Sequence, residues 1–117
     1  MPSIEIIAPS DGQQFTLPRD PTNFQVVLPS VTVRIVEPSA NMQGDALVVR
    51  GTENPASSTT KPLVPGATPN QYQFTRVLLV GAPSPNGVYE SFKVCAWAKI
   101  NGNTFAATPI PIQIKVI

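Results

Sequence analysis

The residues that could do chemistry in this sequence are few and widely separated. Histidine is absent from the 117 residues, which removes a His general base, a Ser-His-Asp or Cys-His nucleophile and the commonest zinc ligand. The lone Cys95 would need a neighbouring base or a helix N-terminus to become a nucleophile, and the sequence around it indicates neither. We therefore interpret Cys95 as a small apolar residue packed on a strand.

Carboxylates are the remaining candidates, because a pair at a defined separation can hydrolyse a glycoside and a cluster of oxygen ligands can bind calcium. The seven acidic residues are dispersed and lie mostly in or beside predicted turns: Glu5, Asp11, Asp20, Glu37, Asp45, Glu53 and Glu90. Solvated turn residues are the simpler interpretation. The glycines stand singly at turns and form no phosphate-binding loop. The sequence predicts a protein that is not an enzyme and that uses no metal or other cofactor.

Composition indicates one globular domain over residues 1–117, with 42% hydrophobic and 13% charged residues. The net charge is +1 and the eight basic residues are scattered, so nucleic acid is not an expected partner. No apolar run approaches the roughly 20 residues of a membrane span, and no export signal is visible. With a single cysteine the domain has no internal disulfide, so we expect its apolar core to hold it together.

The elements that must position any functional surface are short β-strands, because apolar residues alternate and nowhere recur at helical spacing. The predicted strands cover residues 4–6, 24–28, 31–35, 46–51, 71–80, 88–100 and 105–117. Fourteen of the 117 residues are proline, well above the usual share of about 5%, and these prolines separate the predicted strands. About seven strands without a substantial helix predict an all-β fold, an immunoglobulin-like antiparallel β-sandwich.

Two local irregularities are predicted. The apolar phase of 71–80 changes along the strand, which a β-bulge near Thr75 or Arg76 would reconcile. Residues 52–70 carry four of the prolines and are either an arm that grips a partner or a stiff connection. Within them, Lys61 to Val64, including Leu63, is expected to pair briefly at a sheet edge and is a candidate for partner binding.

Trp97 has two interpretations. Alternation puts Phe92, Val94 and Ala96 on one face of the 88–100 strand and Lys93 and Trp97 on the other. If the first face is the core, Trp97 is exposed beside Lys93 and can anchor a protein or stack on a sugar ring. Alternatively, the 52–70 segment covers Trp97, or the phase is reversed and Trp97 belongs to the core.

Pro109 and Pro111 mark an edge, because residues two apart direct their missing N–H donors to the same side of a strand. That side should border solvent or a partner. Asn101 and Asn103 lie in a predicted hairpin turn over 101–104 and are further candidates for partner contact. Strand order places the 37–45 and 101–104 loops at one end of the sandwich and the 81–87 turn at the other.

Two segments resemble the bacterial and phage immunoglobulin-like, or fibronectin-III-like, modules. Such modules open with a strand and a Pro-x-Asp-Gly turn, as in Pro9 to Gly12, and their penultimate strand starts with Gly-x-Tyr, as in Gly87 to Tyr89, before alternating apolar residues and a turn such as 101–104. The resemblance leaves 37–70 unaccounted for. Tyr89 departs from the pattern, because it is out of phase with Phe92. The resemblance implies the sandwich fold and roles as spacer, adhesin, carbohydrate-binding accessory or virion decoration.

Three functions follow in order of preference. The first is a non-enzymatic structural or interaction module, an accessory or decoration protein on the outside of a larger assembly such as a phage virion, with capsid or tail subunits as partners. The second is an extracellular or cell-surface module of a longer bacterial protein that binds protein or glycan. The third, a small hydrolase or metal-dependent enzyme, is disfavoured by the absence of histidine. The expected location is a virion or an extracellular surface.

Overall fold

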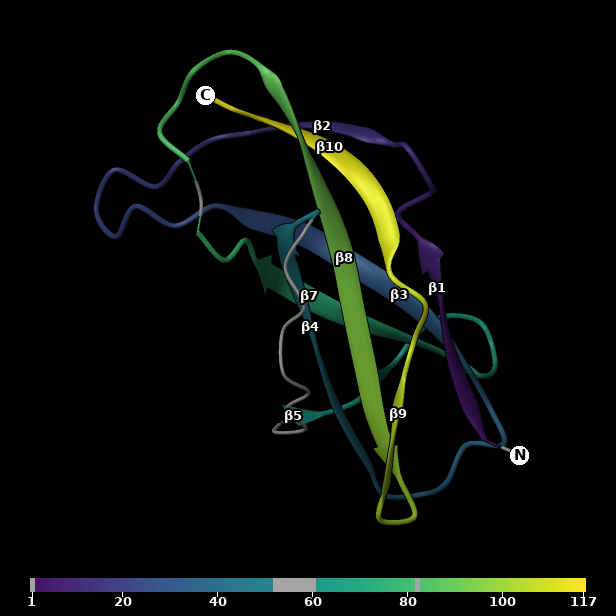
Figure 1. Ribbon diagram of the computed structural model, residues 1–117. Coiled ribbons are helices and arrows are strands. Elements are labelled where there is room, and N and C mark those ends of the chain that lie inside the picture. Colours follow the sequence, from purple (N-terminus) through teal and green to yellow (C-terminus); the bar gives the residue numbers. More distant parts are fainter. Residues whose placement is uncertain (1, 52–60, 82) are drawn as a thin grey trace.

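The computed structural model describes residues 2–51, 61–81 and 83–117. The chain forms two packed β-sheets (Figure 1). The first sheet has the order β1 (Ser3–Ala8), β3 (Val27–Val36), β7 (Gln71–Leu78) and β6 (Val64–Pro65). The second has the order β2 (Gln14–Leu17), β10 (Ile110–Val116), β8 (Tyr89–Ile100), β4 (Met42–Arg50) and β5 (Lys61–Pro62), and β9 (Asn103–Ala106) also pairs with β8. The predicted immunoglobulin-like β-sandwich is confirmed.

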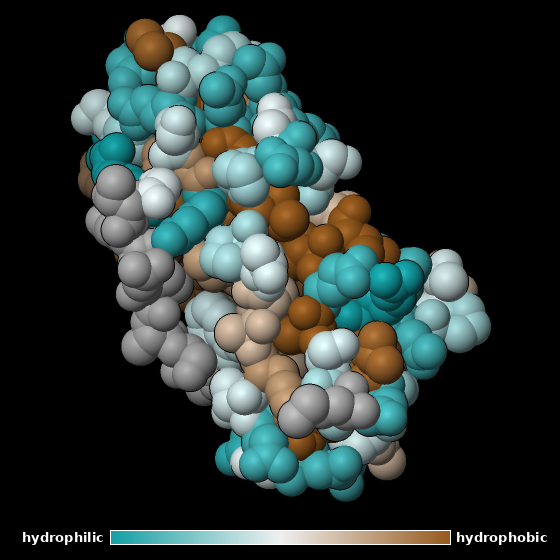
Figure 2. All heavy atoms as spheres, turned by 45° about the vertical axis from the view of Figure 1, so that its right-hand side comes forward, coloured by the Kyte–Doolittle hydropathy of each residue, from teal (hydrophilic) through white to brown (hydrophobic). Residues whose placement is uncertain are grey.

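The core lies between the sheets and follows the predicted alternation. In β3, Val31, Val33 and Ile35 are fully buried, and in β8 Phe92 and Val94 face them from the other sheet. The described residues contain no helix, and so none long and apolar enough to cross a membrane. In Figure 2 a band of apolar side chains runs down the middle of the visible face between polar surfaces. The half-buried side chains that pack on the core are Phe15, Leu63, Tyr72, Phe105 and Ile110.

The N-terminal segment changes sheets. β1 pairs with β3 in the first sheet, the register shifts between Ile6 and Ala8, and the predicted turn at Pro9 to Gly12 leads into β2 of the second sheet. β2 pairs with β10 in parallel, whereas the other strand pairings are antiparallel. The sequence did not predict β2, because four residues with one buried side chain give no alternation to detect.

The strands predicted at 24–28 and 31–35 were expected to be separate, but residues 27–28 and 31–35 belong to one strand, β3, which runs through Pro29, and residues 24–26 lie in the loop before it. The phase does change near Arg76, as expected, but not by a bulge in one strand. The register between β3 and β7 is the same on both sides, with Leu28 opposite Val77 and Val31 opposite Phe74. In both strands the buried side chains change from one parity of residue numbers to the other, at Pro29 in β3 and at Arg76 in β7. Arg76 has a left-handed backbone with φ 53°. A shared change of phase keeps both faces packed without an extra residue.

The C-terminal part differs from the prediction in one respect. Asn101 and Gly102 form a two-residue hairpin turn with positive φ angles, as the Asn-Gly sequence predicts. The strand expected over 105–117 is divided into β9 and β10, and Pro109 lies in the break between them. The carbonyl of Pro111 accepts a hydrogen bond from Gly12 N–H at 2.8 Å on the side away from β8, so the edge marked by this proline adjoins the β1–β2 turn.

Candidate functional site

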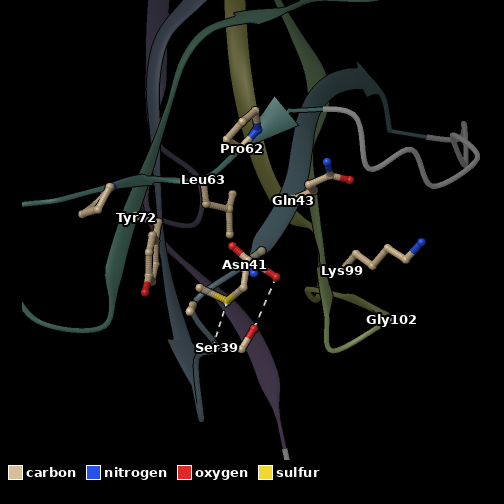
Figure 3. Close-up of a pocket in the computed structure, with 11 residues that line it drawn as sticks. Ser39, Asn41, Gln43, Pro62, Leu63, Tyr72, Lys99 and Gly102 are labelled. Carbon is tan, nitrogen blue, oxygen red and sulfur yellow. Dashed lines mark hydrogen bonds between the residues drawn. The ribbon is translucent and has the colours of Figure 1, made fainter.

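A hollow of about 630 Å³ opens at the end of the sandwich that carries the β3–β4 loop and the β8–β9 hairpin (Figure 3). The predicted sharing of this end by the two loops is confirmed, although β4 already starts at Met42 and shortens the first loop to 37–41. Residues 83–87 of the predicted 81–87 turn lie at the opposite end (Figure 1), and residue 82 lies outside the described residues. The lining residues come from five segments: Ser39, Ala40, Asn41, Met42, Gln43, Pro62, Leu63, Pro65, Tyr72, Lys99 and Gly102.

Short-range contacts fix the wall of the hollow. Ser39 Oγ–H donates to the carbonyl of Asn41 at 3.4 Å, and Ser39 N–H donates to Sδ of Met42 at 3.5 Å. These contacts tighten the β3–β4 loop onto the start of β4. The edge segment is tied to the same place, because Leu63 N–H donates to the carbonyl of Met42 at 3.4 Å. The loop and the edge segment therefore form one connected wall.

The edge segment 61–65 joins the two sheets. β5 pairs with β4 in the second sheet, β6 pairs with β7 in the first, and Leu63 lies between them. Brief edge pairing of this segment was predicted, and it is confirmed. Leu63 packs against the core, and this position depends on Gly44: a Cβ at Gly44 would lie 3.0 Å from Leu63 Cδ2 and 2.5 Å from the carbonyl oxygen of Trp97.

The lining suits a ligand that presents both polar and apolar groups. Asn41 and Gln43 offer amide donors and acceptors, and Tyr72 offers an aromatic ring and a hydroxyl. Met42 and Leu63 supply apolar surface to the lining. No carboxylate is among the lining residues. Lys99 is the charged residue of the lining. The arrangement can hold a ligand by hydrogen bonds and packing.

The structure brings together some of the predicted partner-binding residues. Leu63 lines the hollow, and Asn101 and Asn103 flank Gly102 at its rim. Lys61 lies next to the hollow at the edge of β5, where its Nζ is 3.6 Å from an oxygen of Asp45. The other four, Lys93, Trp97, Pro109 and Pro111, belong to the outer face of β8 and the β9–β10 edge and do not reach the hollow.

Trp97 is buried, with 3% of its surface exposed, so its interpretation as an exposed anchor is wrong. The predicted phase is correct: Trp97 lies on the outer face of β8, where it forms a small apolar cluster with Val49, Cys95 and the half-buried Leu47. The part of the proposed cover at 52–60 lies outside the described residues. The Nε1–H group of Trp97 is buried and has no hydrogen-bond partner among the described residues, which is an unfavourable arrangement for a polar group.

Cys95 shares this outer cluster, and burial raises the pKa of its thiol, an effect that the charge of Lys93 partly opposes. Because the thiolate is the reactive form, we expect the native thiol to react with a disulfide reagent at least about 100-fold more slowly than the unfolded chain in urea. The measurement is the rate of colour release in mildly alkaline buffer, with urea-unfolded protein as the control. Equal native and unfolded rates would show that the outer cluster does not protect Cys95.

Asn41, Gln43 and Tyr72 were not identified as site residues from the sequence. For Asn41 and Gln43 the only signal in the sequence was the predicted placement of the 37–45 loop beside the hairpin. Tyr72 gave no signal, because it reaches the hollow through the pairing of β7 with β6. Among the described residues, no three acidic or cysteine side chains come together in a group that could hold a metal ion. No protein-family model matches the chain. No curated protein matches it either.

Proposed function

We propose that this chain is a non-enzymatic interaction module that attaches to a protein component of a larger assembly, such as the capsid or tail subunits of a phage virion, through the hollow at its β3–β4 and β8–β9 end. Its place of action is the surface of a virion or the outside of a cell. The observation that carries the proposal is the hollow itself. It lies within the range of about 300–1,000 Å³ that is typical of ligand sites.

The construction of the hollow supports this role. Loops held on a rigid β-scaffold are common binding surfaces, and here the β3–β4 loop is fixed by the Ser39 and Met42 contacts. The exposed Asn41 and Gln43 can reach a partner from this rim, and Tyr72 is of a residue type enriched at the energetic centres of interfaces. A partner loop with one apolar side chain and flanking polar groups matches this lining.

The test is sedimentation of the tagged chain through a sucrose gradient, together with the particles or surface assemblies of the cells in which it is expressed. We expect the wild-type chain to sediment with large particles. Gln43→Arg places a long charged side chain in the hollow and should reduce the bound fraction about tenfold, equivalent to about 1.4 kcal/mol. Gln14→Arg, an exposed strand glutamine on β2, is the matched control and should leave binding unchanged.

The outcomes separate clearly. A wild-type chain that remains at the top of the gradient contradicts attachment to an assembly. An equal loss of the particle-bound fraction in Gln43→Arg and Gln14→Arg would place the contact outside the hollow. Thermal unfolding of both variants, with melting temperatures close to that of the wild type, verifies that a loss of binding is not a loss of fold.

The second candidate is glycan binding in the same hollow. It is favoured by the combination of two side-chain amides, Asn41 and Gln43, with the ring of Tyr72, since amides bond sugar hydroxyls and an aromatic ring packs on a sugar face. Titration with soluble oligosaccharides, followed by NMR at the amide groups of Asn41 and Gln43, distinguishes the two. Saturable shifts there favour a glycan, and their absence together with co-sedimentation favours a protein partner.

A further inference from the structure

We propose that Phe24, together with a recess lined by Arg19 and Arg76, forms a second docking surface, which takes an acidic segment of a partner protein. This surface goes beyond the function proposed above and involves different residues. β7 leads from Tyr72 at the hollow to Leu78, which pairs with Val27 directly after the loop that carries Phe24. The two surfaces therefore lie toward opposite ends of the sandwich.

Phe24 is presented to solvent in an unusual way. Its side chain is 60% exposed, and its backbone is left-handed with φ 59°. A bulky residue at positive φ is an energetic outlier, and such strain is concentrated at binding and switch sites. Exposure of a single apolar residue is ordinary, but exposure of one held in a strained backbone calls for a physical reason.

The loop that presents Phe24 is tightly hydrogen-bonded. Asp20 Oδ1 accepts the N–H groups of Thr22 at 2.7 Å and Asn23 at 3.3 Å, and the carbonyl of Asp20 accepts Phe24 N–H at 2.9 Å. Asp20 N–H in turn donates to the carbonyl of Gln25 at 2.9 Å. The backbone bonds to Thr22 and Asn23 lower the pKa of the Asp20 carboxyl, so it stays ionised and keeps these bonds. A preformed loop loses little conformational entropy when a partner binds.

Arg19 clamps the aromatic ring. Its guanidinium lies 4.9 Å from the centroid of the Phe24 ring, in a cation–π arrangement. The backbone N–H of Arg19 donates to the carbonyl of Ile117 at 3.1 Å, and Nη1 lies 3.4 Å from Ser84 Oγ. The Nε–H of Arg19 is buried and has no hydrogen-bond partner in the described part of the chain. The ring and the guanidinium are thus held side by side at the mouth of the recess.

The recess has a volume of about 280 Å³ and an excess of positive charge. Arg19 and Arg76 both line it, and Asp20 is the one carboxylate among the lining residues. Asp20 carries one negative charge and interacts electrostatically with Arg76, so it compensates only one of the two guanidinium charges. The strained backbone at Arg76, with φ 53°, is the point where β3 and β7 change phase, which directs this side chain to the recess.

These features identify the chemistry of the partner. A guanidinium group binds a carboxylate in a planar, bidentate geometry, and two of them beside one recess favour an acidic side chain. The exposed face of Phe24 next to it favours an apolar side chain adjacent in the same segment. Aromatic residues and arginines are the types enriched at the energetic centres of protein interfaces. An acidic segment with interspersed apolar residues satisfies both requirements.

The test uses two capped hexapeptides, one of alternating leucine and aspartate and one of alternating leucine and asparagine, titrated into the full chain and followed by NMR. We expect the acidic peptide to shift the backbone amides of residues 19–25 and 76–78, and the neutral peptide to bind at least about tenfold more weakly. Arg76→Glu should weaken binding of the acidic peptide by about tenfold or more, and Phe24→Ala should weaken it by about fivefold. Val64→Ala, whose side chain is 61% exposed on β6, is the matched control and should have no effect.

Equal shifts by the acidic and neutral peptides, or no shifts in residues 19–25, would overturn the inference. Shifts confined to Asn41 and Gln43 would also overturn it and would support the hollow instead. Loss of co-sedimentation in Gln43→Arg with unchanged peptide binding would leave this second surface intact. The dispersion of the NMR spectrum verifies the fold of each variant, and the two substitutions act on different groups, so a folding failure in one leaves the other as the test.

Discussion

Replacing Trp97 with alanine is expected to lower the free energy of unfolding by about 3–5 kcal/mol, the usual cost of truncating a buried large aromatic side chain. Trp97 is 3% exposed in the cluster with Val49 and Cys95, on the outer face of the second sheet. The loss should appear in urea unfolding followed by far-ultraviolet circular dichroism, because Trp97 is the one tryptophan of the chain and its fluorescence is removed with it.

Trp97→Phe separates packing from hydrogen bonding. Phenylalanine keeps much of the ring volume and removes the Nε1–H group, which is buried and finds no hydrogen-bond partner within residues 2–51, 61–81 and 83–117. Because an unsatisfied buried donor costs about 1–3 kcal/mol, we expect its removal to offset most of the lost packing, so that Trp97→Phe lies within about 1 kcal/mol of the wild type. An alanine variant that loses less than about 1 kcal/mol would contradict the close packing of the outer cluster.

Gly44→Ala is expected to lower the free energy of unfolding by about 2–3 kcal/mol, near the upper end of the cost of overpacking a core. The added Cβ would lie 2.5 Å from the carbonyl oxygen of Trp97, a backbone atom of the neighbouring strand, and 3.0 Å from Leu63 Cδ2. Leucine can adjust, whereas relief of the backbone contact requires β4 and β8 to separate. The measurement is again the urea midpoint, with the slope of the transition checked for constancy.

Gly51→Ala is the matched control for this substitution. A Cβ there would be 3.9 Å from both Cβ and the carbonyl oxygen of Ser91, which is ordinary van der Waals contact. We expect a change within about 0.5 kcal/mol. Equal effects at Gly44 and Gly51 would mean that the close approach of β4 to β8 is not what requires glycine at position 44.

The parts of the fold that were predicted are those in which a strand alternates by itself. The long run over 88–100 has the predicted phase, with Phe92 and Val94 inward and Trp97 outward. The continuous strand through Pro29 was not predicted, because a proline in the sequence is normally taken to end a strand. What preserves the strand is the matching change of phase opposite it at Arg76, and that match is visible only after the two strands are paired.

The candidate site was predicted only at the level of loops. Strand order placed two loops at one end, and Leu63 and the hairpin asparagines are at or beside the hollow. The lining residues Gln43 and Tyr72 depend on long-range pairings of β4 with β5 and of β6 with β7, which no local pattern encodes. The interpretation of Trp97 failed for a related reason: periodicity tells which face of a sheet a residue occupies, but not whether that face is covered.

The parallel pairing of β2 with β10 has a mechanical consequence. Gln14 to Leu17 lie beside Gln113 to Val116 in four consecutive pairs, and the two chain ends lie at opposite ends of the molecule (Figure 1). Once β1 has been released from β3, a pull on the two ends draws β2 toward its start and β10 toward its end. The load then acts along the strand axes and strains the four pairs at once instead of opening them one by one. Forced unfolding is governed by the rate of crossing that barrier. This pairing is suited to resist tension applied between the two chain ends.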